Sequence, residues 1–255
     1  MLSAFATHPG LVRQNNEDSI RTDDNLCIYL LADGIGGHNA GEVASALAVE
    51  TVHTILRSNI AHTSVNEYFE LMIHAIHSAH WEIASRAQTD PTLMGMGTTL
   101  VAAVIRENRA YIANVGDSRC YLLHGGSRSH NDHLQEERRH RFTRLTQDHT
   151  VGDNLLARGI AIEQITRKQF HALTRSIGCG NSPEPDFTTA AIRQGDLLLI
   201  CSDGLTDMLT DAEIETILAD GDASLDTRAA YLVAAANANG GRDNISVVLV
   251  ALPDP

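Results

Sequence analysis

The stretch LCIYLLADGIGGH, residues 26–38, carries the first information about the fold and chemistry of this chain. Its apolar part, residues 26–32, has the length and composition of a β-strand. Asp33 follows this run directly and Gly34 comes next. The first expected element is therefore a strand that ends in a carboxylate.

Other segments resemble residues 26–32 in strand length and composition. They are residues 3–8, 98–105, 109–115, 119–123, 196–201 and 245–252. Apolar residues at three- and four-residue spacing predict amphipathic helices elsewhere. The expected helices are residues 40–58, 65–87, 211–218 and 224–237, with Asp211 and Ser224 as N-caps and Gly240-Gly241 as the last stop.

The order of these elements predicts the class of fold. Helices occur in pairs between runs of strands, so a doubly wound parallel sheet is not favoured. Antiparallel sheets covered by helices, an α+β fold, fit the order better. The length of 255 residues allows one large domain, and we expect a single domain over residues 1–255.

Charge and composition limit the classes of partner. The chain has 19 Lys and Arg against 32 Asp and Glu, a formal net charge of −13. This excess of carboxylates repels nucleic acid, and the one candidate basic patch is Arg138, Arg139 and Arg141. No apolar run is long enough to span a membrane, and the four cysteines form no close pair. We therefore expect a cytoplasmic protein with reduced, mostly buried cysteines.

Four aspartates share one position relative to the expected strands. Asp33, Asp117 and Asp203 each follow an apolar run, and Asp243 precedes one. A single aspartate at a strand end is ordinary turn chemistry. Four of them at neighbouring strand ends would need cations to neutralise their charge, and oxygen donors select Mg²⁺ or Mn²⁺ over Zn²⁺. Two such ions about 3.5–4 Å apart can activate a water for hydrolysis of a phosphate ester.

Seven short motifs occur in a characteristic order. They are RQNNED (13–18), DGIGGH (33–38), GTT (97–99), GDSR (116–119), DH (148–149), SDG (202–204) and DN (243–244). This ordered set resembles the metal-dependent protein phosphatases of type 2C, over nearly the whole chain. The resemblance implies a four-layer α-β-β-α sandwich, a serine/threonine phosphoprotein phosphatase and two Mn²⁺ or Mg²⁺ ions. The segment of about 148–185 resembles the family's flap beside the active site.

The resemblance also implies roles for individual residues. Asp33 resembles the carboxylate that bridges both catalytic metals, Gly34 offers its carbonyl, and Asp203 and Asp243 resemble the other ligands. Asp117 with Asp203 resembles a weaker third-metal site. Asp18 would act through water, with Glu17 as the alternative. Arg13 resembles the phosphate-contacting arginine, and a guanidinium suits paired phosphate oxygens; otherwise it is a surface arginine.

Two departures from the family pattern affect these expectations. Some members carry His after the Asp-Gly pair as a proton donor, whereas this chain has Ile35. The general acid is then His38 or metal-bound water, although a loop His is more often structural. The polar stretch 125–141 interrupts an expected hairpin and is either a partner-binding element or a tolerated insertion.

The expected partners are phosphoserine and phosphothreonine proteins, including a cognate kinase and its substrates. We expect a monomer that binds neither nucleic acid nor membrane. Two other functions remain open on the sequence: a non-catalytic binding module, which would not need Asp33, Asp203 and Asp243 together, and a two-metal hydrolase of nucleic acid or small esters.

Overall fold

Two antiparallel sheets form the centre of the molecule, described here from a computed structural model for residues 1–36, 40–125 and 142–252. The first sheet has the order β1-β11-β10-β7-β8 and the second β2-β3-β5-β6-β9, with β4 paired to β3. The strands are β1 Leu2–His8, β2 Asp18–Asp23, β3 Ile28–Ile35, β4 Gly97–Thr98, β5 Leu100–Arg106, β6 Arg109–Val115, β7 Arg119–Leu123, β8 Phe142–Arg144, β9 Asp186–Ala191, β10 Leu197–Cys201 and β11 Ile245–Ala251.

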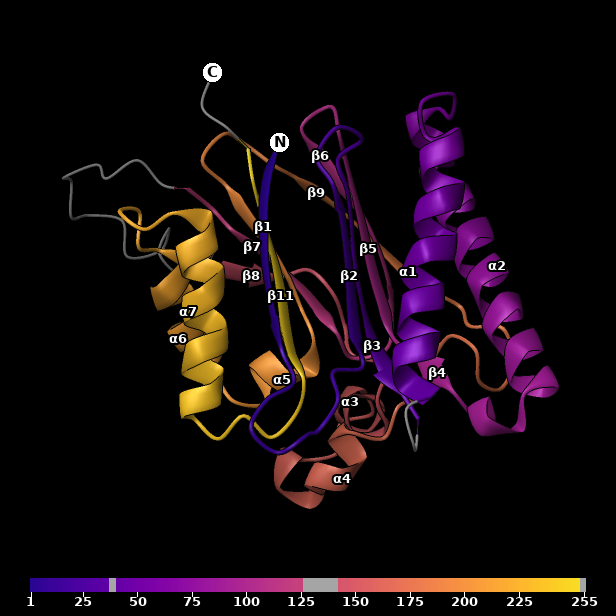
Figure 1. Ribbon diagram of the computed structural model, residues 1–255. Coiled ribbons are helices and arrows are strands. Elements are labelled where there is room, and N and C mark those ends of the chain that lie inside the picture. Colours follow the sequence, from indigo (N-terminus) through magenta and orange to yellow (C-terminus); the bar gives the residue numbers. More distant parts are fainter. Residues whose placement is uncertain (37–39, 126–141, 253–255) are drawn as a thin grey trace.

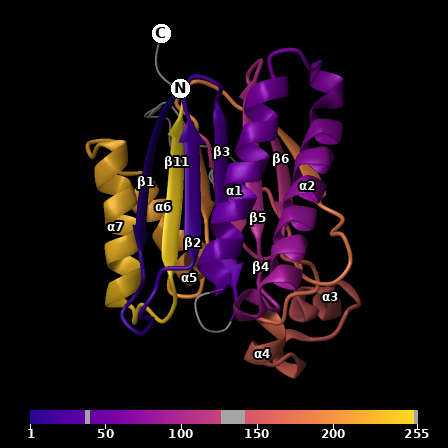
Figure 2. The same ribbon diagram turned by 45° about the vertical axis from the view of Figure 1, so that its right-hand side comes forward.

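Helices cover the outer face of each sheet (Figures 1 and 2). The second sheet is covered by α1 (Ala40–Asn59) and α2 (Tyr68–Thr89), and the first by α6 (Asp211–Leu218) and α7 (Leu225–Ala238). Short helices α3 (Val151–Ala157), α4 (Arg167–Phe170) and α5 (Asp203–Thr206) lie at one end of the sheets. The layers are thus helix, sheet, sheet, helix, as the resemblance implied.

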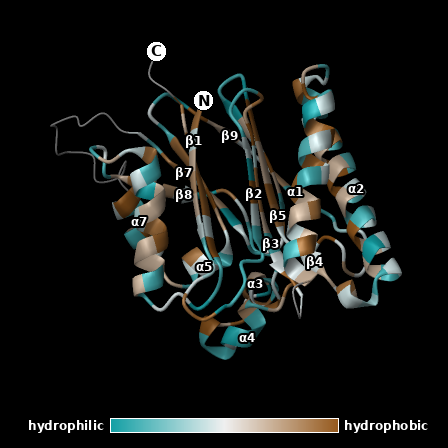
Figure 3. Cartoon of the chain, viewed as in Figure 1, coloured by the Kyte–Doolittle hydropathy of each residue, from teal (hydrophilic) through white to brown (hydrophobic). Residues whose placement is uncertain are grey.

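Three apolar clusters hold these four layers together. One lies between α1, α2 and the second sheet, one between α6, α7 and the first sheet, and the third between the two sheets. Alternate residues of β3 supply different clusters: Leu30 packs toward the helices and Leu31 toward the other sheet. Figure 3 shows the corresponding brown strands between helices that carry teal residues. The predicted α+β class is confirmed.

The expected strands and helices are present, most with ends shifted by one to three residues. Residues 109–115, 119–123 and 211–218 match the predicted bounds. Four strands were not predicted: β2, β4, β8 and β9. Except for the two-residue β4, these strands are only partly buried and lack a continuous apolar run, so they carry no strong periodic signal.

Two smaller expectations need correction. The N-cap of α6 is Thr210, not Asp211, because the Thr210 hydroxyl accepts the backbone N–H of Glu213; Ser224 caps α7 as predicted. All four cysteines are free, but only Cys120 and Cys201 are fully buried.

The polar stretch 125–141 joins β7 to β8, whose ends pair at Leu123 and Phe142. Its residues 126–141, with Arg138, Arg139 and Arg141, lie outside the described part of the chain, as does His38. Among the described helices, none is long and apolar enough to cross a membrane.

Candidate active site

Antiparallel pairing brings the predicted aspartates to one end of the two sheets. Strands β3 and β6 both pair antiparallel with β5, so they run in the same direction and end at the same edge. In the other sheet, β10 ends where its antiparallel neighbour β11 begins. Asp33 and Asp117 therefore lie at or just beyond strand ends that face the same way, and Asp203 and Asp243 flank the matching end of the other sheet.

Strand register places Asp18 opposite Asp33 in the β2–β3 pair. The backbone of Asp33 is held by two threonines from the turn between β4 and β5. Its N–H donates to Thr99 Oγ1 at 3.0 Å, and its carbonyl oxygen accepts from Thr98 Oγ1 at 2.8 Å and Thr99 N at 2.9 Å. Thr99 Oγ1 also lies 2.8 Å from Ser118 Oγ. These buried bonds fix the direction of Asp33, and the GTT motif thus has a positioning role that the sequence did not reveal.

Gly34 allows helix α1 to begin directly against the end of β3. A Cβ on Gly34 would lie 2.2 Å from the carbonyl oxygen of Gly41, and a Cβ on Gly41 would lie 2.9 Å from the carbonyl carbon of Gly34. The Gly34 N–H donates to the Glu17 carbonyl at 3.1 Å. Both glycines are therefore required by close approach of backbones.

Asn244 joins the segments that carry Asp243, Arg13 and Asp18. Its side chain donates to the carbonyls of Pro9 (3.0 Å) and Asn15 (2.8 Å) and accepts from Glu17 N–H at 2.8 Å. Both polar side-chain atoms of this 4% exposed residue are used, in three hydrogen bonds that hold one loop beside Asp243.

Helix α5 places Asp203 in its first turn, directly after the buried Ser202. Ser202 Oγ donates to Asp18 Oδ2 at 2.9 Å and so links Asp18 to this helix. A Cβ on Gly204 would lie 2.0 Å from the Asn244 carbonyl oxygen, so the SDG and DN motifs pack backbone to backbone.

Burial and like charges raise the pKa values of three aspartates. For Asp18, burial and the charges of Asp203 and Asp243 outweigh hydrogen bonds from Ser246 and Ser202, and the pKa is raised to about 7. The pKa of Asp33 is raised well above its ordinary value by burial and by Asp18, Asp203, Asp117 and Asp243. The pKa of Asp117 is raised by burial first and then by Asp203.

This donor set fits a divalent cation. Every expected side-chain ligand is a carboxylate, which suits Mg²⁺ or Mn²⁺, and Asp18 Oδ1 is buried without a hydrogen-bond partner. Among the described residues, no three acidic, His or Cys side chains form a ready-made metal cluster. Two of the expected ligands are instead engaged with cations of the chain: Asp243 with Arg13 and Asp203 with His171.

Arg13 lies at the rim of the acidic centre. Its Nη2 donates to Asp243 Oδ2 at 2.8 Å, and 54% of its side chain is exposed. Although partial burial opposes the charged form, Asp243, Glu17 and Asp33 raise the pKa of Arg13. A charged, exposed guanidinium beside the carboxylates is suited to bind an incoming anion.

Asp117 lies at the opposite side of the centre, next to a buried ion pair. Arg119 binds Asp148 through two nitrogens, with Nη2 2.7 Å from Oδ2, and Arg144 also binds Asp148. The following residue, His149, accepts the Gly116 N–H at 3.1 Å through Nδ1. The GDSR and DH motifs therefore form one unit that holds the backbone at Asp117.

The segment 148–185 forms a second wall of the site. Its helix α4 begins at Arg167 and is followed by His171, and both side chains reach the α5 region of the sandwich. Arg167 Nη2 lies 3.3 Å from Oδ2 of Asp207, the residue after α5, and His171 Nδ1 lies 3.8 Å from Asp203 Oδ2. The nearby Asp203 carboxylate raises the pKa of His171, against the effect of burial. No sequence pattern predicts these contacts, since only folding brings α4 to Asp207.

The C-terminal part of this segment, which includes Gly178 and Pro183, is hydrogen-bonded to α2. His80 Nδ1 accepts the Gly178 N–H at 3.1 Å, and His77 Nε2 lies 3.2 Å from the Pro183 carbonyl oxygen. The histidines on this face of α2 differ in exposure: His74 is exposed, His77 is half-buried, and His80 is 2% exposed because it packs under this returning chain.

Comparisons with known proteins agree with this geometry. The family model described as Protein phosphatase 2C matches residues 8–245. The chain is 35% identical to the serine/threonine phosphatase stp of Listeria monocytogenes serovar 1/2a, covering 98% of this chain and 95% of the relative. It is 36% identical to the protein phosphatase PhpP of Streptococcus pneumoniae serotype 2, covering 98% and 96%.

Solved structures show the same similarity. The serine/threonine phosphatase PstP/Ppp of Mycobacterium tuberculosis superimposes with a TM-score of 0.82 at 32% identity, covering 99% of both chains. The catalytic domain of a PstP phosphatase in complex with two manganese ions gives a TM-score of 0.81 at 33% identity, covering 99% of this chain and 98% of that one.

Proposed function

The chain belongs to the protein phosphatase 2C family and is a metal-dependent serine/threonine protein phosphatase, and we propose that its chemistry resides at the acidic centre around Asp33. The observation that carries this assignment is the half-buried, backbone-fixed Asp33, with Asp18, Asp117, Asp203 and Asp243 close enough to raise its pKa. Such crowding of carboxylates is stable only when cations balance it.

Mn²⁺ or Mg²⁺ is the cofactor of this family, and we propose its protein ligands. Asp33, the Gly34 carbonyl, Asp203 and Asp243 would hold the two catalytic ions, with Asp18 acting through water. Asp117 and Asp203 would hold a weaker third ion. When bound, the ions activate a water and polarise the phosphoryl group.

The residues of the chain then bind and orient the substrate. Arg13 would release Asp243 and bind two oxygens of the phosphate through its paired N–H donors. Thr99 keeps the backbone of Asp33 in place during this exchange, because it accepts the Asp33 N–H, and the backbone N–H of Asn244 donates to Asp243 Oδ1 at 2.8 Å. The flap, residues 148–185, would contact the protein around the phosphorylated residue.

The substrates, cellular location and oligomeric state of the protein are also proposals. Substrates are phosphoproteins, and we propose a cognate kinase and its substrates among them. Four cysteines without a disulfide favour a reducing compartment, in agreement with a cytoplasmic location. We propose one catalytic domain over residues 1–255 that acts as a monomer, which light scattering of the purified chain would test.

The central experiment is hydrolysis of a phosphothreonine peptide with Mn²⁺, with Mg²⁺ and with excess chelator. Phosphate release that needs metal and is lost in Asp33→Ala supports the proposed centre. Unchanged release by a folded Asp33→Ala protein would contradict the role of Asp33.

A further inference from the structure

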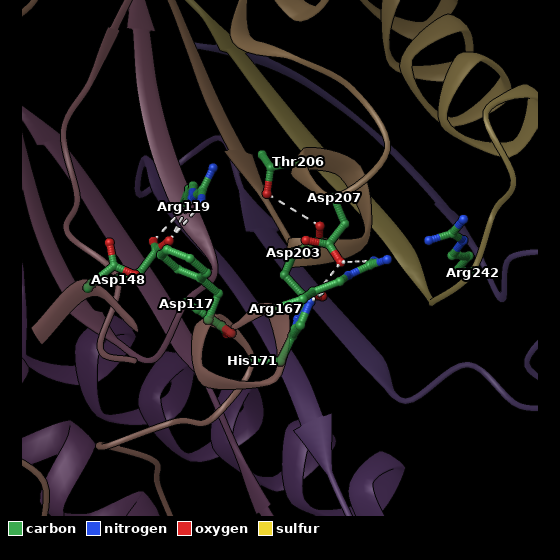
Figure 4. A pocket seen from close by; sticks show the side chains of 11 residues that line it. Asp117, Arg119, Asp148, Arg167, His171, Asp203, Thr206, Asp207 and Arg242 are labelled. Carbon is green, nitrogen blue, oxygen red and sulfur yellow. Dashed lines mark hydrogen bonds and ion pairs between the residues drawn. The ribbon is translucent and has the colours of Figure 1, made fainter. Parts of the chain in front are cut away.

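A cavity of about 330 Å³ lies beside the acidic centre, between the flap and α5 (Figure 4). Its walls combine acidic side chains, among them Asp117, Asp203 and Asp207, with the cations Arg119, Arg167 and Arg242. The cavity thus adjoins two of the expected metal ligands and is large enough for a further side chain of a bound substrate.

Two of the three arginines in this cavity are already paired within the chain. Arg119 binds Asp148 and Arg167 binds Asp207, as the dashed lines of Figure 4 show. Arg242 is exposed and makes no hydrogen bond or ion pair with any residue in 1–36, 40–125 or 142–252. Its sequence neighbour Asp243 is taken by Arg13.

The backbone that carries Arg242 is fixed, although its side chain is free. Gly240 and Gly241 have φ values of +126° and +47°, which favour glycine. The Gly241 carbonyl accepts the Leu11 N–H at 2.6 Å, and its N–H donates to the Ala236 carbonyl at 3.1 Å. Arg242 is therefore held at the rim of the cavity by a turn anchored on both sides.

A phosphopeptide is an anion that approaches a chain of net charge −13. Cations at the mouth of the site offset this repulsion and guide the substrate. Arg13 is already assigned to the phosphate that is hydrolysed. The guanidinium of Arg242, at the cavity that Asp203 also lines, is unpaired among the described residues and is available for another anionic group.

We infer that Arg242 binds a second anionic group of the substrate, a carboxylate or a second phosphate, on a residue close to the phosphorylated serine or threonine. This inference rests on the proposed function and specifies its substrate class. Both groups present paired oxygens that a guanidinium can bind through two N–H donors. Arg242 is thus a specificity-determining residue, and it takes no part in the bond cleavage.

The test compares kcat/KM for phosphothreonine peptides that differ at one neighbouring position, on either side of the phosphothreonine: Glu, phosphoserine, Ala or Lys. The wild-type protein should favour the Glu or phosphoserine peptide over the Ala peptide. Arg242→Ala should lower this ratio by about fivefold, as expected for loss of one exposed ion pair. Arg242→Glu should favour the Lys peptide. The Glu and phosphoserine arms identify which anion is preferred.

Arg57→Glu is the matched control. Arg57 is also exposed and unpaired among the described residues, and it lies in the last turn of α1, about 25 Å along that helix from the acidic centre. The same change in net charge there should leave the ratio of kcat/KM values unaltered.

Each outcome decides a separate question. A ratio that is unchanged in Arg242→Ala and Arg242→Glu, or that shifts equally in Arg57→Glu, would overturn the role of Arg242. Absence of metal-dependent hydrolysis of every peptide by the wild-type protein would instead overturn the proposed function.

Discussion

The two walls of the active site are built in different ways. On the sandwich side, the groups that hold the aspartates are buried: Thr99 is 1%, Ser202 0% and Asn244 4% exposed. On the flap side, the side chains at α4 that reach the centre are exposed, with 59% of the Arg167 side chain and 36% of the His171 side chain accessible.

This difference separates two requirements of the enzyme. The chemistry needs carboxylates held in one arrangement, and buried hydrogen bonds to backbone provide it. Recognition of different phosphoproteins needs a surface that can adjust, and exposed ion pairs are weak enough to be exchanged for substrate contacts. We therefore expect residues of the sandwich wall to determine the rate of turnover and residues of the flap wall to determine which substrates are chosen.

The largest expected contrast is between two aspartates four residues apart, Asp203 at the start of α5 and Asp207 just after its end. Asp203→Asn should lower kcat/KM for a phosphothreonine peptide by more than about a hundredfold, because it alters a proposed metal ligand. Asp207→Asn should lower it by about fivefold or less, since only exposed contacts with Arg167 and His171 are lost. Steady-state kinetics with Mn²⁺ measure both. Similar losses in the two variants would remove the distinction between the walls.

Thr99→Val tests the buried support of Asp33. The change leaves the Asp33 N–H without its acceptor, so the free energy of unfolding should fall by about 1–3 kcal/mol. Activity should fall by about 10- to 100-fold, as for loss of a group that orients a metal ligand. Urea unfolding and kinetics provide the measurements, with Thr216→Val on the exposed face of α6 as control. Normal activity in Thr99→Val would show that Asp33 is held without it.

Arg13→Ala should raise KM by about tenfold and leave kcat nearly unchanged, because Arg13 is proposed to bind the phosphate before and during the reaction. Its exposed ion pair with Asp243 should contribute less than about 1 kcal/mol to stability. Initial rates over a range of phosphopeptide concentrations separate KM from kcat. An unchanged KM would contradict the proposed role.

The smallest effect concerns the anchor of the flap on α2. Burial, and then His77, lower the pKa of His80 in the folded protein, where Nδ1 must stay unprotonated to accept the Gly178 N–H. The unfolded chain takes up this proton more readily, so the free energy of unfolding should decrease as the pH falls below about 6.5. The slope from this one group is at most about 1.4 kcal/mol per pH unit.

His80→Asn keeps an acceptor in place of Nδ1 without this titration. Urea unfolding between pH 5 and 8 should show a smaller pH dependence in His80→Asn than in the wild-type protein. His62→Asn, at an exposed position, should behave as the wild type. An equal pH dependence in all three proteins would exclude His80 as the source.

The sequence predicted the sandwich well for a physical reason. Strands such as 109–115 and 119–123 are buried, so their apolar runs record their position in the core. The ends of these apolar runs also predicted, from the sequence alone, that Asp33, Asp117, Asp203 and Asp243 lie close together. Their roles at the metals remain predictions.

The features that the sequence did not predict depend on contacts between segments that are far apart in the chain. Strand β9 is a partly buried edge strand, and Arg167, His171 and Asp207 meet only after the flap folds onto α5. The same holds for Asn244, whose three partners lie more than 220 positions away in the chain. No local pattern encodes such partners.

The place of β11 between β1 and β10 has a consequence for synthesis. Asp243 and Asn244 immediately precede this strand, and Asn244 holds the loop from the beginning of the chain. A ribosome that has translated the first 240 residues has therefore made Arg13, Asp18, Asp33 and Asp203 but no complete centre. The centre can therefore be completed only after β11 has left the exit tunnel and has paired between β1 and β10.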